Sequence, residues 1–246
     1  MKTKIVILAA GKGSRMGSEL PKVLVPLHGK AMINHLMEAI TASGNNQRPV
    51  VVVSPDNRDI ISQSLREYEL DYAIQEQQLG TGHAVACARN HIESAIDNVL
   101  VLYGDQPFLK AASIKIFCEL EPVALTIMST ILPNFEGWHH NFYHLGRIVR
   151  DENNNVKAIV EYKDATDAEK LITEINLGFM CFNKEWLFAN VDKLTANNNA
   201  HEFYLTSLVD VARHQGVAVN CLPINSDEAM GINSYEELNI AESLKL

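Results

Sequence analysis

The chain has 246 residues, 47% of them hydrophobic, and its 21 Lys or Arg against 30 Asp or Glu give a formal net charge of −9. This composition excludes a disordered chain, and the apolar runs fall well short of the roughly 20 residues that a membrane-spanning helix needs. The four cysteines lie far apart without a CxxC pair, so we expect neither a disulfide framework nor a zinc site, and we expect a reducing, cytoplasmic setting.

Positive charge is concentrated at the start of the sequence. Residues 1–30 contain six Lys or Arg and one Glu, a net charge of +5, so the rest of the chain carries −14. An acidic protein with one basic, glycine-rich segment suits a small polyanion better than a nucleic acid. We therefore expect small-molecule substrates, with no nucleic acid and no membrane as partner. The sequence indicates no oligomeric state.

Two hydrophobic periods alternate through about the first 120 residues. Continuous runs rich in Val and Ile predict parallel strands that are buried on both faces, and amphipathic stretches between them predict helices. The expected strands are 4–10, 49–54, 70–75 and 98–105, and the expected helices are 32–40, 58–67 and 83–95. Such alternation predicts an α/β fold with a Rossmann-like, mostly parallel sheet flanked by helices.

The pattern is mixed after about residue 120. The expected elements there are strands at 123–132 and 175–183, a hairpin with an Asn-rich turn at 146–163, and helices at 203–215 and 234–244. No linker separates the two parts of the chain. The sequence therefore predicts one domain over residues 1–246, with a first half of about 1–120 and a second half of about 121–246 that adds a mixed β lobe over the site.

A glycine-rich turn follows the first expected strand, within LAAGKGSRMGSELPKVL at residues 8–24. Gly11 and Gly13 allow a ligand to approach the backbone N–H groups closely. Arg15 can bind two phosphate oxygens at once, whereas Lys22 supplies a point charge. The segment lacks the P-loop pattern and the third small residue of the dinucleotide fingerprint. It therefore predicts a phosphate-binding loop of another kind.

Polar side chains in other segments are also placed for ligand binding. Asp105 follows an apolar run at the sheet edge where open α/β folds bind ligands, and its carboxylate suits Mg²⁺. Gln75 and Gln78 carry amides that can pair with the edge of a nucleobase. Thr81 precedes an expected helix, either as its N-cap or beside N–H groups that face a ligand.

These segments, in this order, resemble the sugar-1-phosphate nucleotidyltransferases. The motifs are LAAGKGSRMGSELPKVL (8–24), QEQQLGTGHAV (75–85), VLYGDQP (101–107), GRIVRDENNNVKAIVEYKDAT (146–166), EINLGF (174–179), HEFYLTSLV (201–209) and GINSYEEL (231–238). Nearly the whole chain is similar to the N-terminal uridyltransferase domain of the bifunctional N-acetylglucosamine-1-phosphate uridyltransferase/glucosamine-1-phosphate acetyltransferases. The resemblance implies a nucleotide-diphospho-sugar transferase (GT-A-like) fold, with a nucleotide-binding first half and a sugar-binding second half.

The resemblance also implies a role for each matching residue. The implied nucleotide-binding residues are Leu8, Ala9, Ala10, Gly11, Gly13, Gln75, Gln78, Gly80 and Thr81. The implied sugar-binding residues are Tyr103, Gly104, Gly146, Glu161, Asn176 and Tyr204. Arg15 and Lys22 are the implied catalytic residues, and Asp105 and Asn233 the implied Mg²⁺ ligands. Simpler explanations are a surface pair of Glu161 with Lys163, a helix cap at Asn233 and helix-core packing of Tyr204.

The implied reaction converts UTP and N-acetylglucosamine 1-phosphate to UDP-N-acetylglucosamine and pyrophosphate, a step of nucleotide-sugar biosynthesis for the cell envelope. Another sugar 1-phosphate or another nucleotide is an alternative, because Gln106 replaces the family's apolar residue and residues 133–145 match nothing in the family. A non-catalytic nucleotide-binding regulator is a second alternative, disfavoured because the motif residues are retained together. The histidines of 133–145 (His139, His140 and His144) are expected in a surface loop rather than at a metal.

Overall fold

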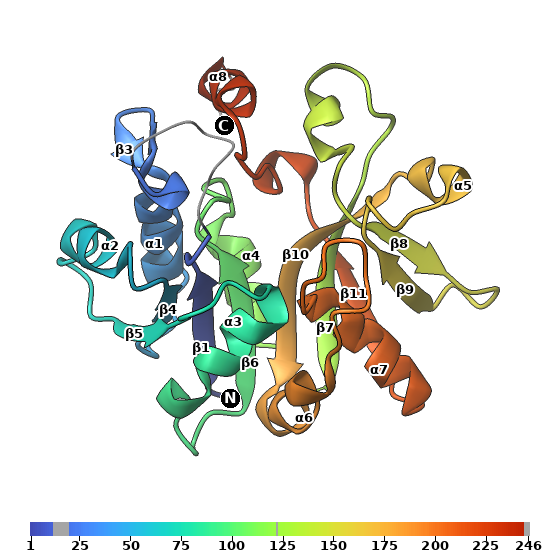
Figure 1. Cartoon of the computed structure of the whole chain (residues 1–246), viewed down its shortest axis with the longest axis horizontal. Helices are drawn as coiled ribbons and strands as arrows, with labels where there is room; N and C mark the ends of the chain where they lie inside the picture. Colours follow the sequence, from blue (N-terminus) through green and yellow to red (C-terminus); the bar gives the residue numbers. More distant parts are fainter. Residues whose placement is uncertain (12–19, 122, 244–246) are drawn as a thin grey trace.

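The computed structural model of the chain describes residues 1–11, 20–121 and 123–243. Within these residues, a nine-stranded mixed sheet has the strand order β11-β7-β10-β6-β1-β4-β5, and β8 and β9 join it because β8 pairs with β10 (Figure 1). The strands are β1 (Thr3–Leu8), β4 (Val50–Val53), β5 (Asp71–Ile74), β6 (Asn98–Tyr103), β7 (Leu125–Ile131), β8 (Arg147–Arg150), β9 (Val156–Val160), β10 (Glu174–Asn183) and β11 (Val219–Pro223). A separate ribbon pairs β2 (Pro26–Leu27) with β3 (Lys30–Ala31).

The strands of the first half are parallel, and β10 reverses the direction. β1 pairs in parallel with both β4 and β6, and β4 pairs in parallel with β5. β10 runs antiparallel between β6 and β7, so strands from the two halves form one continuous sheet. The structure therefore confirms the predicted Rossmann-like, mostly parallel sheet with a mixed β portion.

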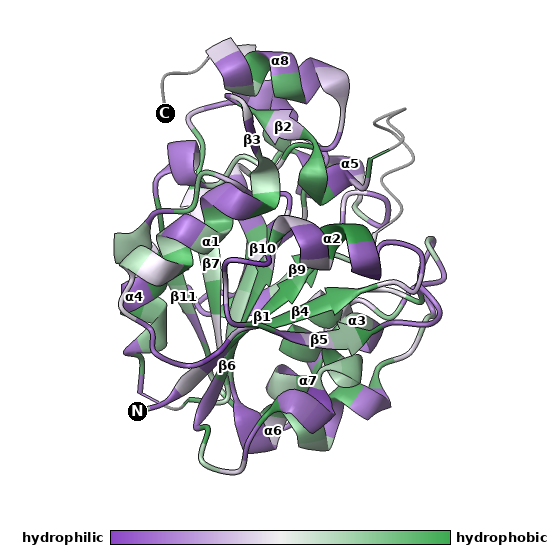
Figure 2. Cartoon of the chain, turned by 90° about the vertical axis from the view of Figure 1, so that its left-hand side faces the viewer, coloured by the Kyte–Doolittle hydropathy of each residue, from purple (hydrophilic) through white to green (hydrophobic). Residues whose placement is uncertain are grey.

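Helices cover both faces of this sheet. They are α1 (Met32–Ala42), α2 (Arg58–Ser64), α3 (Thr81–Cys87), α4 (Ala111–Cys118), α5 (Asp167–Lys170), α6 (Lys184–Asn190), α7 (Leu208–His214) and α8 (Tyr235–Ser243). In β1, Ile5 and Ile7 belong to the core that α1 and α4 cover, whereas Val6 belongs to the core that α3 and α7 cover. Successive strand residues point to opposite faces, so both faces must be apolar. In Figure 2 the central strands β1 and β4 are largely green (hydrophobic), whereas the helices around them carry both purple (hydrophilic) and green residues.

Short 3-10 helices connect several of these elements. They span Lys22–Leu24, Arg89–His91, Gly137–Phe142, Val191–Lys193, Leu205–Ser207 and Ser226–Glu228. None of the helices in the described ranges has the length and apolar character that crossing a bilayer requires.

The predicted elements are present, but two predicted helices are wrong in extent. The helix expected at 83–95 ends at Cys87, and a 3-10 helix follows it. The helix expected at 203–215 begins only at Leu208, after a 3-10 helix at Leu205–Ser207. Several short elements were not predicted from the sequence, namely the β2–β3 ribbon, α4, α5, α6 and β11.

Candidate active site

Two adjoining cavities open at the carboxyl ends of β1 and β6. The loop-side cavity, of about 430 Å³, lies beside the glycine-rich segment and contains Gly11, Lys22 and Gln75 in its wall. The hairpin-side cavity, of about 280 Å³, lies beside the β8–β9 hairpin and contains Gly146 and Glu161. The residues that line both cavities are Thr81, Tyr103, Asp105, Glu202 and Asn233. Because they share this wall, the two cavities form one cleft.

Most of the predicted site residues meet in this cleft. The predicted nucleotide-binding residues in the loop-side cavity are Leu8, Ala9, Ala10, Gly11, Gln75, Gln78, Gly80 and Thr81. The predicted sugar-binding residues in the hairpin-side cavity are Tyr103, Gly146, Glu161, Asn176 and Tyr204. Gly104 lines neither cavity. It packs closely against Val23, which lines the loop-side cavity, since a Cβ atom at Gly104 would lie 3.0 Å from the Val23 side chain. Gly13 and Arg15 lie outside the described residues.

Lys22 lies where the two cavities meet. Its ammonium group forms an ion pair with the Asp105 carboxylate and donates a 2.6 Å hydrogen bond to Asn233 Oδ1. Two oxygen atoms from distant parts of the sequence thus converge on one cationic group. Mg²⁺ commonly takes one or two protein oxygens together with phosphates and water, so this donor pair fits the predicted metal ligands.

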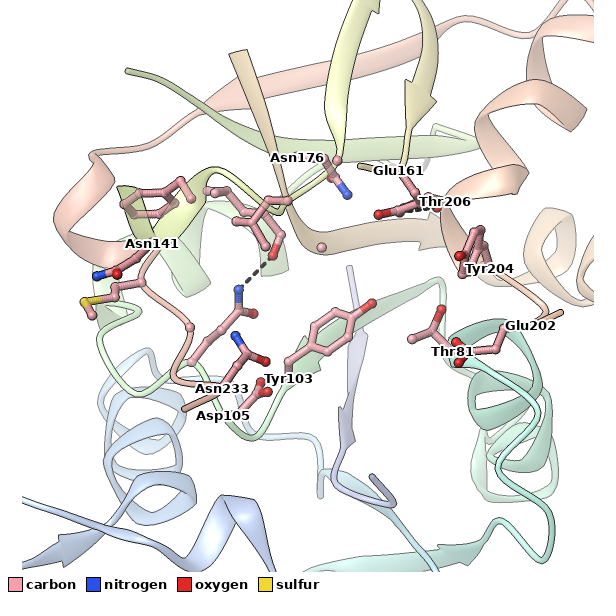
Figure 3. A pocket seen from close by; sticks show the side chains of 18 residues that line it. Thr81, Tyr103, Asp105, Asn141, Glu161, Asn176, Glu202, Tyr204, Thr206 and Asn233 are labelled. Carbon is pink, nitrogen blue, oxygen red and sulfur yellow. Dashed lines mark hydrogen bonds between the residues drawn. The ribbon is translucent and has the colours of Figure 1, made fainter. Parts of the chain in front are cut away.

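The alternative helix-cap role for Asn233 is not the one seen. Ser234 Oγ accepts a 3.2 Å hydrogen bond from the backbone N–H of Glu237 at the start of α8. The Asn233 side chain is turned toward Asp105 and the cleft (Figure 3). In the described residues, no group of three or more His, Cys, Asp or Glu could hold a metal ion by itself.

Gln75 is held in one orientation in the loop-side cavity. Its side chain is 4% exposed, and its Nε2 lies 3.1 Å from both the Gly80 carbonyl oxygen and His83 Nδ1. Both contacts use the N–H groups of the amide, so the amide oxygen is left for a ligand. Gln78 instead donates to the Ala10 carbonyl at 2.9 Å and holds the end of the glycine-rich segment.

Gly80 and Thr81 connect α3 to the segment before α7. Gly80 has φ +116°, and a Cβ atom there would lie 2.7 Å from the backbone of Phe203, so a side chain cannot fit. Thr81 Oγ1 accepts a 2.9 Å hydrogen bond from the N–H of Leu205. Thr81 is the first residue of α3, and the N-cap is Gly80, so the N-cap explanation of Thr81 is wrong.

Glu161 is an internal acceptor of the hairpin-side cavity. Thr206 Oγ1 donates a 2.8 Å hydrogen bond to Glu161 Oε1. Figure 3 shows the Glu161 side chain facing the cleft. Burial raises the pKa of the Glu161 carboxyl, and the charges of Asp164 and Glu202 act in the same direction. A Cβ atom at Gly146 would lie 3.3 Å from Glu161 Oε2, so glycine keeps this carboxylate accessible. Glu161 is therefore part of the cavity wall rather than a surface residue.

Two tyrosines complete the polar lining. Burial, together with Asp164 and Glu161, raises the pKa of Tyr204 to about 12. Burial raises the pKa of Tyr103 as well, and the Glu161 and Asp105 charges add to the effect. Both phenols are thus neutral at physiological pH and can donate hydrogen bonds to an anionic ligand. The Tyr103 ring packs on Gly178, where a Cβ atom would lie 2.8 Å away.

The cleft also contains residues that the sequence did not assign to a site. Glu202 and Thr206 belong to the quoted HEFYLTSLV motif, so the motif itself was the available signal. Asn141 comes from residues 133–145, whose part at Gly137–Phe142 is a 3-10 helix against the hairpin-side cavity. The rings of His140 and Tyr143 stack at 5.7 Å there. Asn141, Phe142 and Leu145 of this segment line the cavity, whereas His139, His140 and His144 do not, and His140 and His144 are exposed, as expected for a surface loop.

The cleft at the carboxyl edge of this mixed sheet is that of a nucleotidyltransferase. The chain belongs to the family of MobA-like NTP transferase domains, whose match covers residues 5–143. A crystal structure described as a glucose-1-phosphate thymidylyltransferase from Bacillus anthracis in complex with a sucrose has the same fold, with a TM-score of 0.76 and 16% identity over 98% of this chain and 94% of that chain.

Curated relatives extend the similarity over the full sequence. The bifunctional protein GlmU of Clostridium novyi is 38% identical over 242 residues, which are 97% of this chain and 51% of that protein. The bifunctional protein GlmU of Caldicellulosiruptor saccharolyticus is 39% identical over 250 residues, 100% of this chain and 52% of that protein. The resemblance stated from the motifs is confirmed, and the chain spans about half the length of the curated relatives it matches.

Proposed function

We propose that the chain transfers a uridylyl group from UTP to N-acetylglucosamine 1-phosphate and forms UDP-N-acetylglucosamine and pyrophosphate. The observation that carries this proposal is the continuity of the cleft at Lys22, Asp105 and Asn233. A nucleotide in the loop-side cavity and a sugar 1-phosphate in the hairpin-side cavity would bring their phosphates to this junction. The similarity to proteins named GlmU along nearly all of the chain supports the same assignment.

The orientation of Gln75 supports uracil as the base. Its amide nitrogen is engaged by Gly80 and His83, so its oxygen is the atom available in the cavity. That oxygen is an acceptor, and it can pair with the N3–H of uracil. Cytosine has an acceptor at N3, so this orientation of the amide disfavours it there.

The donor set at the junction supports Mg²⁺ as the cofactor. Asp105 and Asn233 would hold the ion, which supplies positive charge to the phosphate oxygens when it is bound. Lys22 pairs with both residues in the structure, and its ammonium group would turn to the phosphates of the nucleotide. Arg15 is proposed as a second phosphate ligand from its sequence position.

The reaction needs no nucleophilic side chain. A sugar 1-phosphate is ionised at neutral pH, so its own oxygen can attack the α-phosphorus of UTP in line, with pyrophosphate leaving from the opposite side. The protein then contributes positioning and charge neutralisation. Glu161 and Asn176 would orient the sugar, and Lys22 would stabilise the negative charge of the nucleotide phosphates. The reducing setting that the free cysteines suggest fits a cytoplasmic reaction.

The experiment is pyrophosphate release with Mg²⁺, in which UTP, CTP, GTP and dTTP are crossed with N-acetylglucosamine 1-phosphate and glucose 1-phosphate. We expect the UTP and N-acetylglucosamine 1-phosphate pair to dominate. Dominance of another pair would establish the alternative of another sugar or nucleotide. Silence across the whole grid would contradict transferase activity and favour a nucleotide-binding regulator.

Matched lysine variants test the junction. We expect Lys22→Ala to lower kcat by about two orders of magnitude, because it removes a charge from the reacting phosphates. Lys30→Ala is the control, since Lys30 forms an exposed 2.7 Å ion pair with Glu38, and exposed pairs contribute little. Equal rates for the two lysine variants would contradict the role of Lys22.

Asp105→Asn should raise the Mg²⁺ concentration needed for half-maximal activity.

A further inference from the structure

Unpartnered polar atoms are concentrated in the wall of the hairpin-side cavity. Among the described residues, six buried side-chain nitrogen or oxygen atoms have no hydrogen-bond partner. Three of the six belong to residues that line this one cavity, namely Gln106 Oε1, Asn141 Nδ2 and Asn176 Oδ1. They come from three separate segments, and all three belong to amides. Such a concentration is expected where a polar ligand supplies the missing partners.

Gln106 is the best defined of the three. Its side chain is only 6% exposed, and its Nε2 donates a 2.9 Å hydrogen bond to the carbonyl oxygen of Leu177 in β10. This bond fixes which end of the amide is nitrogen, so the unpartnered atom is the acceptor. Gly231 lies against the Gln106 side chain, since a Cβ atom there would lie 3.4 Å from Gln106 Cγ.

A buried acceptor without a partner destabilises the folded protein, and an apolar side chain of similar size would avoid that cost. The Gln106 oxygen is therefore expected to gain its partner from the ligand. An amide oxygen can only accept, so the partner must be a hydrogen-bond donor, either a hydroxyl or an amide N–H. Both groups occur on N-acetylhexosamine 1-phosphates.

We propose that Gln106 is a specificity-determining residue that accepts a hydrogen bond from one hydroxyl or amide N–H of the sugar 1-phosphate. This inference rests on the proposed function, and it adds a contact to those of Glu161 and Asn176. A site with a buried acceptor discriminates strongly against a substrate that lacks the matching donor, because the acceptor is then left unpaired inside the complex.

The test compares wild type with Gln106→Leu in pyrophosphate release. The substrates are N-acetylglucosamine 1-phosphate, its 3-, 4- and 6-deoxy analogues, and glucose 1-phosphate, which lacks the amide. We expect Gln106→Leu to lower kcat/KM for N-acetylglucosamine 1-phosphate about tenfold or more and to change KM for UTP less than about twofold. With the wild-type protein, one of the analogues should show the same loss in kcat/KM that Gln106→Leu causes with N-acetylglucosamine 1-phosphate. With that analogue, Gln106→Leu should cause no further loss. Gln106→Met replaces Gln106→Leu if the latter does not fold.

Asn98 provides a matched control outside the cleft. It is 1% exposed, its Nδ2 donates to the Leu120 carbonyl at 3.0 Å, and its Oδ1 is also without a partner. Asn98→Leu should leave sugar discrimination unchanged. The inference is overturned if Gln106→Leu matches wild type, or if it reduces activity equally with every substrate including all the deoxy analogues. Failure of wild type with every sugar 1-phosphate overturns the proposed function, and this inference with it.

Discussion

Under the proposed function, the orientation of the Gln75 amide would decide which base the loop-side cavity accepts. Gln75 Nε2 has two acceptors, the Gly80 carbonyl and His83 Nδ1, each at 3.1 Å. The Gly80 carbonyl oxygen is held in place because it also accepts a 3.1 Å hydrogen bond from the backbone N–H of Ala84. His83 lines neither cavity, so under the proposed function it would act on the base only through Gln75.

Removing His83 should weaken the discrimination between UTP and CTP. In His83→Ala the Gln75 amide loses one of its two acceptors and can rotate to present N–H groups to N3 of cytosine. We expect the ratio of kcat/KM for UTP to that for CTP to fall about five- to tenfold, the equivalent of one hydrogen bond. His214→Ala is the control, since His214 lies exposed on α7. An unchanged ratio would show that His83 does not position the amide.

Glu161→Gln should make the protein more stable at neutral pH. Burial raises the pKa of Glu161 in the folded state, so folding favours the protonated form. The destabilisation from Glu161 is absent below the unfolded glutamate pKa of about 4.3 and develops as pH rises through the folded pKa. The Tm gain of Glu161→Gln should therefore be present at pH 7–8 and disappear toward pH 4, while sugar 1-phosphate turnover falls.

Glu169→Gln is the control of opposite sign. Glu169 closes a capping box with Thr166 at the start of α5, and these hydrogen bonds lower the pKa of its carboxyl. Its stabilisation is present above the unfolded pKa and is lost as pH falls through the folded pKa. The Tm of Glu169→Gln should thus fall below that of wild type at pH 7–8. A Tm change of the same sign in both variants would contradict the assignment for Glu161.

The sequence predicts single residues only where a motif defines the ligand contact. The positions of Glu161 and Asn176 followed from the family resemblance, and the structure places both in the hairpin-side cavity. The orientation of Gln75 and the unpartnered oxygen of Gln106 could not be predicted. Both depend on partners that tertiary folding supplies, such as the Leu177 carbonyl, which belongs to a distant strand.

At the scale of elements, the segment 133–145 is attached to the sheet by Arg147. The Arg147 side chain is fully buried and donates to the carbonyl oxygens of Tyr143, Leu145 and Lys170. The rings of Phe135 and Tyr143 lie 4.8 and 5.5 Å from its guanidinium carbon. Its guanidinium group thus links β8 to the wall of the hairpin-side cavity.

Arg147→Lys should loosen that wall. A lysine keeps the charge but cannot reach several carbonyl oxygens in one plane, so buried acceptors lose their partners. We expect a loss of about 1–3 kcal/mol in the free energy of unfolding and a rise of about tenfold in KM for the sugar 1-phosphate, with little change in KM for UTP. Urea unfolding and steady-state kinetics measure both.

Arg150→Lys is the matched control on the same strand. Arg150 forms a 2.6 Å ion pair with Glu174 and lines neither cavity. Arg150→Lys should leave KM for the sugar 1-phosphate unchanged. If the KM values of the two variants shift together, the change comes from β8 as a whole rather than from residues 133–145.

Elements with a single strong period were predictable from the sequence, and mixed ones were not. β4 is the run VVVV, buried at every residue, as a central parallel strand requires. β11 is an edge strand with two exposed residues among five, so it lacks a clear period. The helical stripe is blurred in α4 and α6, because Ile116 of α4 is exposed and α6 buries only Leu187 and Asn190.

At the scale of the whole molecule, the two halves are joined through the sheet and share the cleft. β6 and β10 pair along the centre, and Thr81, Tyr103, Asp105, Glu202 and Asn233 line both cavities. A ligand that fills both cavities contacts residues of both halves at once. Binding of a ligand to the folded state stabilises it by RT ln(1 + [L]/Kd), so relative affinities at one ligand concentration can be read from Tm.

UDP-N-acetylglucosamine should therefore raise Tm more than UMP or N-acetylglucosamine 1-phosphate does at the same concentration. The two parts of one molecule bind without a second loss of translational freedom, so its affinity exceeds that of either part. A ligand at about a hundred times its Kd adds about 2.7 kcal/mol, which raises Tm by several degrees for a chain of this size. Thermal unfolding with Mg²⁺ measures the three shifts, and Glu161→Gln should reduce the excess for UDP-N-acetylglucosamine while leaving the UMP shift intact. Equal shifts for UMP and UDP-N-acetylglucosamine would mean that the hairpin-side cavity does not bind the sugar.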